Sequence, residues 1–268
     1  MTKVSNNILV FINDQAKDIN DLILNENSEV EKIFPNIFSI VVDSKPLDWL
    51  IKTYSSQELA ENEYNNLMIL KDCKNIPKIL ASGSVKREFN YIILSRAKGI
   101  DLYEYVKVNN ISENESKKIM KNLLTTVKYI HGKKLIHGDI KIENIIYDYN
   151  SNDICLIDFE SSKRTLEFMS PEQCGNSNKN VTNKTDIWSC GIVLYCMLSK
   201  KCPFTTAKGI LTKNPIFPSK FSSKLQDLLS CMLDKNPRIR IIVDDALNHE
   251  WFDDDSSITP VSSPEFMN

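Results

Sequence analysis

A short polar stretch within an otherwise apolar part of the chain brings together residue types that can carry chemistry. Asp139, Lys141 and Asn144 lie within six residues of one another, and Asp158 follows an apolar run. A carboxylate can accept a proton, an ammonium group can neutralise an anion, and oxygen atoms are the ligands that Mg²⁺ prefers. Each residue alone has an ordinary explanation, because Asp139 could be a turn residue and Asn144 a strand cap. Their joint spacing is what indicates a site.

Four sequence blocks surround these residues. They are Leu135–Ile146, Ile157–Glu160, Thr165–Glu172 and Thr185–Gly191, and a later segment, Asn236–Arg240, follows them. In this order and spacing they resemble the catalytic half of a eukaryotic-type serine/threonine protein kinase. The C-terminal half is most similar to the calmodulin-dependent and AMP-activated kinase group. Any one tripeptide would be weak evidence for this family, whereas four blocks in the same order and spacing are specific to it.

The resemblance implies a role for each residue of the polar stretch. Asp139 would orient the acceptor hydroxyl and take its proton, and Lys141 would lie against the transferring phosphate of ATP. Asn144 and Asp158 would hold Mg²⁺. The Asp-x-Lys-x-x-Asn spelling, with Thr165 further on, resembles serine/threonine kinases and not tyrosine kinases.

In the first third of the chain, the resemblance makes Lys52 the phosphate-binding lysine. Its partner should be a helix glutamate. Glu63 fits this place because Leu67 and Leu70 follow it at helical spacing, and Glu61 is the alternative. A solvated strand-end lysine or a solvated helix carboxylate is the ordinary reading of such residues.

The same resemblance places the nucleotide base against a hinge at Leu94–Gly99, with Leu94 as gatekeeper. Apolar residues at such positions are ordinarily core residues, and only their alignment with the motifs of the family suggests that they bind the base. The remaining nucleotide-binding positions that it implies are Val41, Leu50, Ser95, Ala97, Asp101 and Ile146.

Carboxylates beside the catalytic stretch suggest the substrate class. Glu143, Asp101 and Glu167 match places where related kinases set acidic groups against substrate arginines, and Thr165 belongs to the substrate-binding segment. Surface carboxylates are usually only solvated. We expect a protein substrate with Arg or Lys two or three residues before the acceptor Ser or Thr.

The chain departs from the family at several positions. Phe34, Asn36 and Ser39 replace the three glycines of the phosphate-covering loop, which predicts a weaker nucleotide grip. Glu160 replaces the glycine after Asp158-Phe159. Gly138 stands where many of these kinases carry an arginine that receives a loop phosphate, so a non-RD kinase is expected.

These departures leave two hypotheses open. The first is an active serine/threonine kinase that uses ATP and Mg²⁺. The second is a pseudokinase, a binding or scaffold module with weak or no catalysis. A third, a small-molecule phosphotransferase of the same fold, is disfavoured by the peptide-binding segment Thr165–Glu172.

The elements that must position these residues can be outlined from sequence periodicity. Phe38–Val42, Trp49–Tyr54 and Tyr91–Leu94 are rich in β-branched and aromatic residues and predict strands, and Glu58–Leu70 predicts one helix between them. The helices expected later are Ser112–His131, Asp186–Leu198, Ser222–Leu233 and Val243–Trp251. A small β-rich half followed by a larger helical half predicts an α+β, bilobal protein-kinase-like fold.

The domain bounds follow from the extent of the resemblance. We expect an N-terminal extension over 1–30, a kinase domain over 31–252 and a disordered acidic tail over 253–268. Within the domain, the N-lobe spans about 31–94 and the C-lobe about 99–252.

Composition bounds the remaining classes. Among 268 residues, 33 basic and 35 acidic side chains give a net charge of −2, so neither nucleic acid nor a membrane is an expected partner. The seven cysteines form no Cys-x-x-Cys pair, which favours buried thiols in a reducing compartment. No signal peptide or membrane span is expected. We expect a cytoplasmic monomer, with the nucleus as the alternative location.

Overall fold

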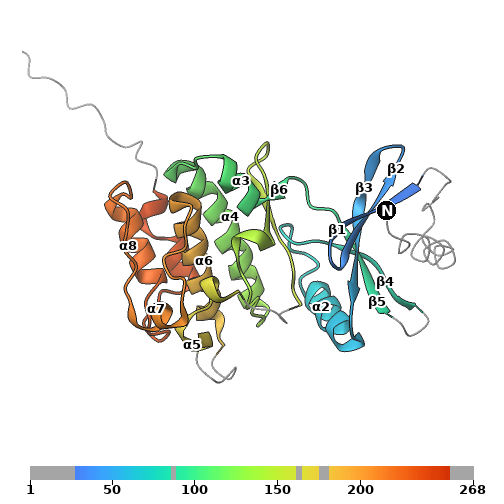
Figure 1. Cartoon of the computed structure of the whole chain (residues 1–268). Coiled ribbons are helices and arrows are strands. Elements are labelled where there is room, and N and C mark those ends of the chain that lie inside the picture. Colours follow the sequence, from blue (N-terminus) through green and yellow to red (C-terminus); the bar gives the residue numbers. More distant parts are fainter. Residues whose placement is uncertain (1–27, 86–88, 161–164, 175–180, 254–268) are drawn as a thin grey trace, which may run out of the picture.

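Two lobes of different construction make up the structure (Figure 1), a computed structural model that describes residues 28–85, 89–160, 165–174 and 181–253. One lobe is a sheet with a single described helix, and the other is mostly helical. The predicted bilobal α+β fold is therefore confirmed. None of the helices in the described residues is long and apolar enough to cross a membrane.

The small lobe is built on a five-stranded antiparallel sheet with the strand order β1-β2-β3-β5-β4. Its strands are β1 (Ser28–Phe34), β2 (Ile37–Val42), β3 (Lys45–Tyr54), β4 (Ile79–Val85) and β5 (Phe89–Ser95). Asp43 and Ser44 connect β2 to β3 and both have positive φ, which is the geometry of a tight hairpin turn. The central strand β3 carries Lys52.

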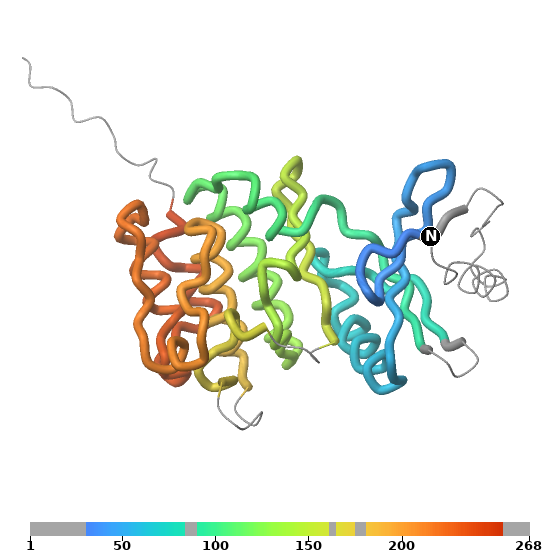
Figure 2. The backbone as a smooth tube through the Cα atoms, in the orientation of Figure 1, coloured from blue at the N-terminus to red at the C-terminus, as the bar shows by residue number. Residues whose placement is uncertain are grey.

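One helix, α2 (Gln57–Ile69), lies between the sheet and the helical lobe (Figure 2). Ser56 caps its N-terminus by accepting a hydrogen bond from the Leu59 amide at 3.3 Å. Ala60, Glu63 and Leu67 are its buried residues. Because these positions follow helical spacing, the carboxylate of Glu63 lies on the same face as the apolar anchors.

The helical lobe surrounds α6, which is buried along almost its whole length. The elements of this lobe are β6 (Ile100–Asp101), α3 (Leu102–Val108), α4 (Glu113–Gly132), β7 (Ile145–Asp148), β8 (Asp153–Leu156), α5 (Pro171–Cys174), α6 (Asn183–Ser199), α7 (Ala207–Thr212), α8 (Ser223–Met232) and α9 (Val243–Leu247), with 3-10 turns at Ile142–Asn144, Leu166–Phe168 and Glu250–Phe252. Strands β6, β7 and β8 form a small antiparallel sheet between the helices of this lobe and the sheet of the other lobe (Figure 1).

Two sequence expectations about the elements are wrong in detail. The helix expected over Val243–Trp251 ends at Leu247, because His249 has extended backbone and caps the following turn through its side chain. Strand β1 begins at Ser28, inside the segment expected to be an extension. The tail over 254–268 lies outside the described residues, as do residues 1–27 of the extension.

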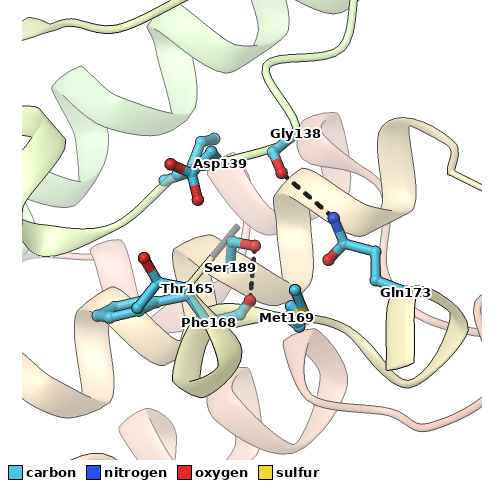
Figure 3. A pocket seen from close by; sticks show the side chains of 8 residues that line it. Gly138, Asp139, Thr165, Phe168, Met169, Gln173 and Ser189 are labelled. Atoms are coloured by element: carbon cyan, nitrogen blue, oxygen red, sulfur yellow. Dashed lines mark hydrogen bonds between the residues drawn. The ribbon is translucent and has the colours of Figure 1, made fainter. Parts of the chain in front are cut away.

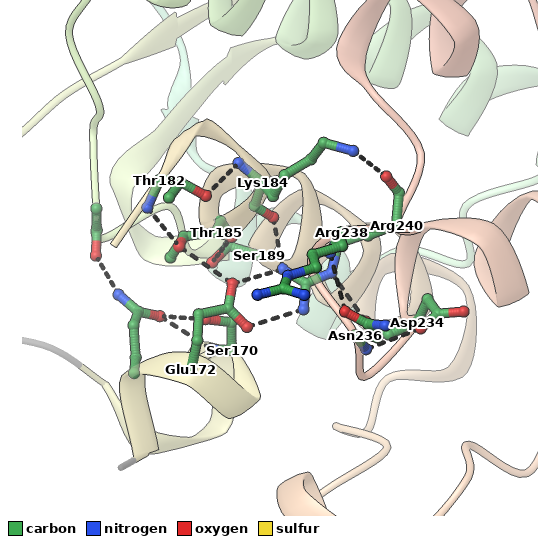
Figure 4. A network of polar contacts seen from close by, with 12 residues as sticks. Ser170, Glu172, Thr182, Lys184, Thr185, Ser189, Asp234, Asn236, Arg238 and Arg240 are labelled. Carbon is green, nitrogen blue, oxygen red and sulfur yellow. Dashed lines mark hydrogen bonds and ion pairs between the residues drawn. The ribbon is translucent and has the colours of Figure 1, made fainter. Parts of the chain in front are cut away.

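A buried ion pair joins α5 to the C-terminal part of this lobe (Figure 4). The Arg240 guanidinium donates to Glu172 at 2.7 and 2.9 Å, and it also donates to the backbone oxygens of Lys184 and Asp234. The Thr185 hydroxyl donates to the same carboxylate at 3.2 Å. Because all three nitrogens of the guanidinium donate hydrogen bonds and Glu172 supplies a counter-charge, the charge of the buried Arg240 is compensated.

We predict that Glu172→Gln destabilises the protein by about 3–5 kcal/mol, because it leaves the buried guanidinium of Arg240 without a counter-charge. Equilibrium unfolding in urea measures the change. Glu250→Gln is the matched control, since Glu250 is exposed and the same substitution there should alter the free energy of unfolding by less than about 0.5 kcal/mol. Equal effects of the two variants would contradict the prediction.

Candidate active site

The loop that carries Asp139 is held from below by a buried carboxylate on α6. Asp186, fully buried, accepts hydrogen bonds from the backbone amides of His137 at 3.0 Å and Gly138 at 2.9 Å. The His131 ring lies 2.8 Å from the same carboxylate. Three contacts to one buried group fix the backbone just before Asp139, so the position of its carboxylate is preorganised.

Side chains from both sides of this loop converge on Asp139. Its carboxylate lies 3.1 Å from the Lys141 ammonium, which also donates to the Thr165 hydroxyl at 3.1 Å. The Asn144 amide donates to the Asp139 backbone oxygen at 2.9 Å. Asp139 and Thr165 line one small pocket, seen in Figure 3. The structure thus brings the acid, the ammonium group and the substrate-segment threonine together.

Burial changes the acidity of Asp139. Desolvation raises the pKa of this carboxyl above its ordinary value of 3.8, although the neighbouring Lys141 acts in the opposite direction. A carboxylate whose pKa is raised holds a proton more readily once it has accepted one, which suits a group that takes up a proton during a reaction.

Across the cleft, the Lys52 ammonium lies among three carboxylates. It is 2.5 Å from Glu63, 2.6 Å from Asp158 and 3.6 Å from Glu160. The Tyr54 hydroxyl donates to Glu63 at 2.9 Å, on the same carboxylate oxygen that Lys52 contacts. Glu61, the alternative partner, is exposed and accepts a hydrogen bond from Gln57. The structure therefore places Glu63, and not Glu61, against Lys52.

The two lobes meet through this cluster. Burial alone would lower the pKa of Lys52, but the charges of Glu63 and Asp158 outweigh it and the pKa is raised. Burial likewise opposes ionisation of Asp158, and Lys52 outweighs it, so that the pKa of Asp158 is lowered. Ionised forms of both groups are therefore stabilised at neutral pH.

The donor set of the cleft suits a hard divalent cation. One ligand atom from each of Glu63, Asp158 and Glu160 lies within 4.8 Å of the others. The amide nitrogen of Asn144 is committed to Asp139, which leaves its oxygen as the atom able to bind a cation. Mg²⁺ takes oxygen ligands of this kind together with phosphate oxygens, and Asn144 and Asp158 fit that chemistry.

Comparison with known proteins agrees with this geometry. A protein-family profile described as "Protein kinase domain" matches residues 45–252. The chain belongs to the protein kinase family. It is 30% identical over 213 residues to sperm motility kinase 3A of Mus musculus, and 35% identical over 181 residues to the serine/threonine-protein kinase ppk6 of Schizosaccharomyces pombe. It is also 25% identical over 244 residues to CBL-interacting protein kinase 5 of Oryza sativa.

The matches cover much of this chain and a smaller part of its relatives. They span 72%, 62% and 75% of this chain, respectively. They span 42% of the mouse protein, 23% of the fission yeast protein and 52% of the rice protein. The shared part is thus the kinase domain, and these relatives are longer proteins.

Within this kinase domain, the expected base-binding residues come from strands of both lobes. Leu50 on β3 pairs with the gatekeeper Leu94 on β5, and Val41 lies on the neighbouring strand β2. Ile146 lies on β7 of the other lobe. These four residues come from both lobes, as a site between the lobes requires.

Other expected site residues have defined local contacts. Ser95 exchanges hydrogen bonds with Lys78 at 2.8 Å, and Ala97 follows it in the half-buried connection to the helical lobe. Asp101 caps α3 by accepting from the Glu104 amide at 2.8 Å, so one of its oxygens has a structural role.

The two substrate-side carboxylates lie in one neighbourhood. Glu143 is exposed and Glu167 is half-buried. Both raise the pKa of the Cys196 thiol through their charge, after the larger effects of a Cys202 hydrogen bond and of burial. Glu143 follows Lys141 by two residues and Glu167 follows Thr165 by two, and the Lys141 ammonium donates to the Thr165 hydroxyl at 3.1 Å.

The hairpin in place of the glycine-rich loop adopts a conformation that needs no glycine. Pro35 and Asn36 form the connection between β1 and β2. The Asn36 oxygen accepts from the Thr53 amide at 2.9 Å, which extends the pairing with β3. Phe34, Asn36 and Ser39 all avoid positive φ. The loss of the loop glycines is thus compatible with an antiparallel hairpin, although the pairing of β1 with β2 is irregular between Lys32 and Phe34.

In contrast to the hairpin, the backbone at Gly138 has a conformation that favours glycine. Its φ is +77°, in the left-handed region that favours glycine, and an added Cβ would meet nothing within 4 Å. Backbone conformation, and not crowding, therefore selects glycine here. The Gln173 amide donates to the Gly138 oxygen at 3.2 Å (Figure 3).

Sequence reasoning missed a contact that joins the hinge to the sheet. The Arg96 guanidinium donates to the Ser39 hydroxyl and, at 2.9 Å, to the backbone oxygen of Leu47. Ser39 is fully buried and pairs with Leu50 across the β2–β3 ladder. The only sequence signal was a serine at a glycine position, which does not indicate its partner 57 residues away.

We predict that Arg96→Ala destabilises the small lobe by about 1–3 kcal/mol, because the buried Ser39 hydroxyl and the Leu47 carbonyl lose their donor. Thermal unfolding followed by circular dichroism measures the loss. Lys98→Ala is the matched control, since Lys98 is an exposed cation two residues away in the same connection. An unchanged melting temperature for Arg96→Ala would show that the contact contributes nothing.

Proposed function

We propose that this protein is an active serine/threonine kinase that transfers the γ-phosphate of ATP to protein hydroxyls with Mg²⁺. The observation that carries the proposal is the simultaneous assembly of both halves of the site. Lys52 of the small lobe contacts Glu63 and, in the helical lobe, Asp158, and Lys141 lies 3.1 Å from Asp139 within the helical lobe. Phosphoryl transfer depends on positioning and charge neutralisation, which such an arrangement supplies.

Each residue then has a task that its contacts support. Asp139 orients the acceptor hydroxyl and takes its proton, while Lys141 neutralises charge beside it. Lys52 binds phosphate oxygens, held in place by Glu63. Asn144 and Asp158 hold Mg²⁺, which when bound neutralises phosphate charge. Val41, Leu50, Ile146 and the connection through Ser95 and Ala97 bind the base.

A pseudokinase is the second candidate, and one contact favours it. Glu160 stands 3.6 Å from Lys52, where its carboxylate competes with phosphate for the ammonium group. The missing loop glycines act in the same direction by reducing backbone contact with phosphates. In that case the folded domain would serve as a binding module.

Replacing the proton acceptor distinguishes these candidates. We predict that Asp139→Asn lowers peptide phosphorylation by at least about a hundredfold while ATP binding and melting temperature stay near wild type, because the residue acts on the acceptor. Incorporation of labelled phosphate from Mg²⁺-ATP into peptides is the measurement. Asp158→Asn serves as a second variant that should lose Mg²⁺-dependent nucleotide binding as well as transfer.

Wild-type protein without measurable transfer, at any Mg²⁺-ATP concentration, would favour the pseudokinase. Full activity of Asp139→Asn would overturn the mechanism given above.

Activity should also depend on the ionisation of Asp139. Because the carboxylate must be charged to accept a proton and burial raises its pKa, we predict that kcat/KM falls as the pH is lowered, with a midpoint above the ordinary 3.8. Lys141 lowers this pKa, so the residual activity of Lys141→Gln should show its acid limb at higher pH. A limb that does not move between the two proteins would contradict the assignment.

We propose further that the substrate is a protein with basic residues near the acceptor, since Glu143 and Glu167 each lie two residues from a partner in the contact between Lys141 and Thr165. A peptide with Arg two or three residues before Ser should have a KM about tenfold below that of its Ala counterpart. The double variant Glu143→Gln/Glu167→Gln should erase this preference, whereas the exposed control Glu104→Gln should keep it. An acidic or proline-directed preference in a peptide array would exclude the proposal.

A further inference from the structure

Two cysteine sulfurs are in contact at the end of the central helix. Cys196 lies in the last turn of α6 and Cys202 in the segment that follows, and their sulfur atoms are 3.2 Å apart. All seven cysteines lie within the described ranges, and all are free thiols. A disulfide needs a sulfur separation of about 2.05 Å, so closure asks for a movement of roughly 1 Å.

The chain between the two cysteines is a tight turn with anchored ends. Lys200 caps α6 in the left-handed conformation, and the Ser199 hydroxyl accepts a hydrogen bond from the Lys201 amide at 3.2 Å. Beyond the turn, Phe204 is buried and stacks on Trp188 with ring centroids 5.8 Å apart. These contacts return the chain over α6 and hold Cys202 against Cys196.

The two cysteines also differ in solvent exposure, which suits an oxidation in which one thiol reacts first and the other reacts with its product. Cys202 is half-buried, whereas Cys196, whose sulfur it contacts, is buried. The hydrogen bond from Cys196 lowers the pKa of the Cys202 thiol, although burial opposes this. In contrast, burial raises the pKa of Cys231, which is also half-buried.

We propose that Cys196 and Cys202 form a reversible redox site that reacts with a peroxide and closes to an intramolecular disulfide. The Cys202 thiolate attacks a peroxide oxygen, the O–O bond breaks, and a sulfenic acid and a hydroxide ion form; the hydroxide takes up a proton from the solvent, equivalent to the proton that the thiol lost on ionisation, and becomes water. The Cys196 sulfur then attacks the Cys202 sulfur, and the hydroxyl leaves as a second water with the proton of Cys196. Two electrons pass from the sulfurs to the peroxide.

The position of this pair connects it to the substrate side of the domain. The charges of Glu143 and Glu167 act on both sulfurs, which places the pair close to these carboxylates. The segment after Cys202 leads into α7, which packs against α5. A disulfide would join the start of this segment covalently to α6. Oxidation would therefore restrict the movement of this segment relative to α6.

The test uses the full chain, reduced and then freed of reductant. It is treated with graded hydrogen peroxide, free thiols are alkylated, and the digest is mapped by mass spectrometry. We expect a Cys196–Cys202 cross-linked peptide, with both thiols lost at one rate about tenfold or more above that of Cys231. Dithiothreitol should restore all seven alkylatable thiols.

Two variants make the result specific. Cys202→Ser should abolish the cross-link, and the matched Cys231→Ser should leave it unchanged. Direct oxidation of Cys202 to a sulfinic acid without a cross-link, or equal loss rates at Cys202 and Cys231, would overturn the proposal. Because mass is the readout, the outcome does not depend on whether the domain transfers phosphate.

Discussion

The arrangement of the two lobes depends on one buried ammonium group. Lys52 is 4% exposed, and an unpaired charge in such a place costs several kcal/mol. Its partners come from different parts of the fold: Glu63 from α2, and Asp158 from the segment after β8. The Phe159 amide also donates to Glu63 at 3.3 Å. The carboxylates that compensate the charge of Lys52 therefore connect the sheet to α2 and to the helical lobe.

Contacts within each lobe position the site residues of that lobe. In the helical lobe, Asp186 fixes the backbone at His137 and Gly138, so the position of Asp139 does not depend on the other lobe. In the small lobe, the position of Lys52 is fixed by its place in the central strand β3. The contact between Lys52 and Asp158 then relates the two halves, in addition to an apolar core whose buried residues come from both lobes.

How far the sequence predicted this site depends on how local each contact is. Asp139 and Asn144 belong to one loop and one 3-10 turn, so their spacing predicted their proximity. The family resemblance and helical spacing favoured Glu63 as the partner of Lys52 but left Glu61 as an alternative, which the contacts in the structure exclude. The bilobal fold followed from the order of strands and helices in the same way. The contact of Arg96 with Ser39 joins residues far apart in the chain through side chains with no periodic signal. Short strands such as β4, whose residues are small and mixed, also escaped prediction because strand propensity depends on neighbours.

The balance between a kinase and a pseudokinase rests on what Glu160 does to the charge of the cleft. Three carboxylates around one ammonium leave an excess of two negative charges, which attracts a divalent cation. Glu160 is about 1 Å further from Lys52 than Glu63 and Asp158 are, so Coulomb attraction engages Lys52 chiefly with the nearer two. Glu160 is therefore the most distant of the three carboxylate partners of Lys52, and its charge adds to the negative field at the place that we propose for Mg²⁺.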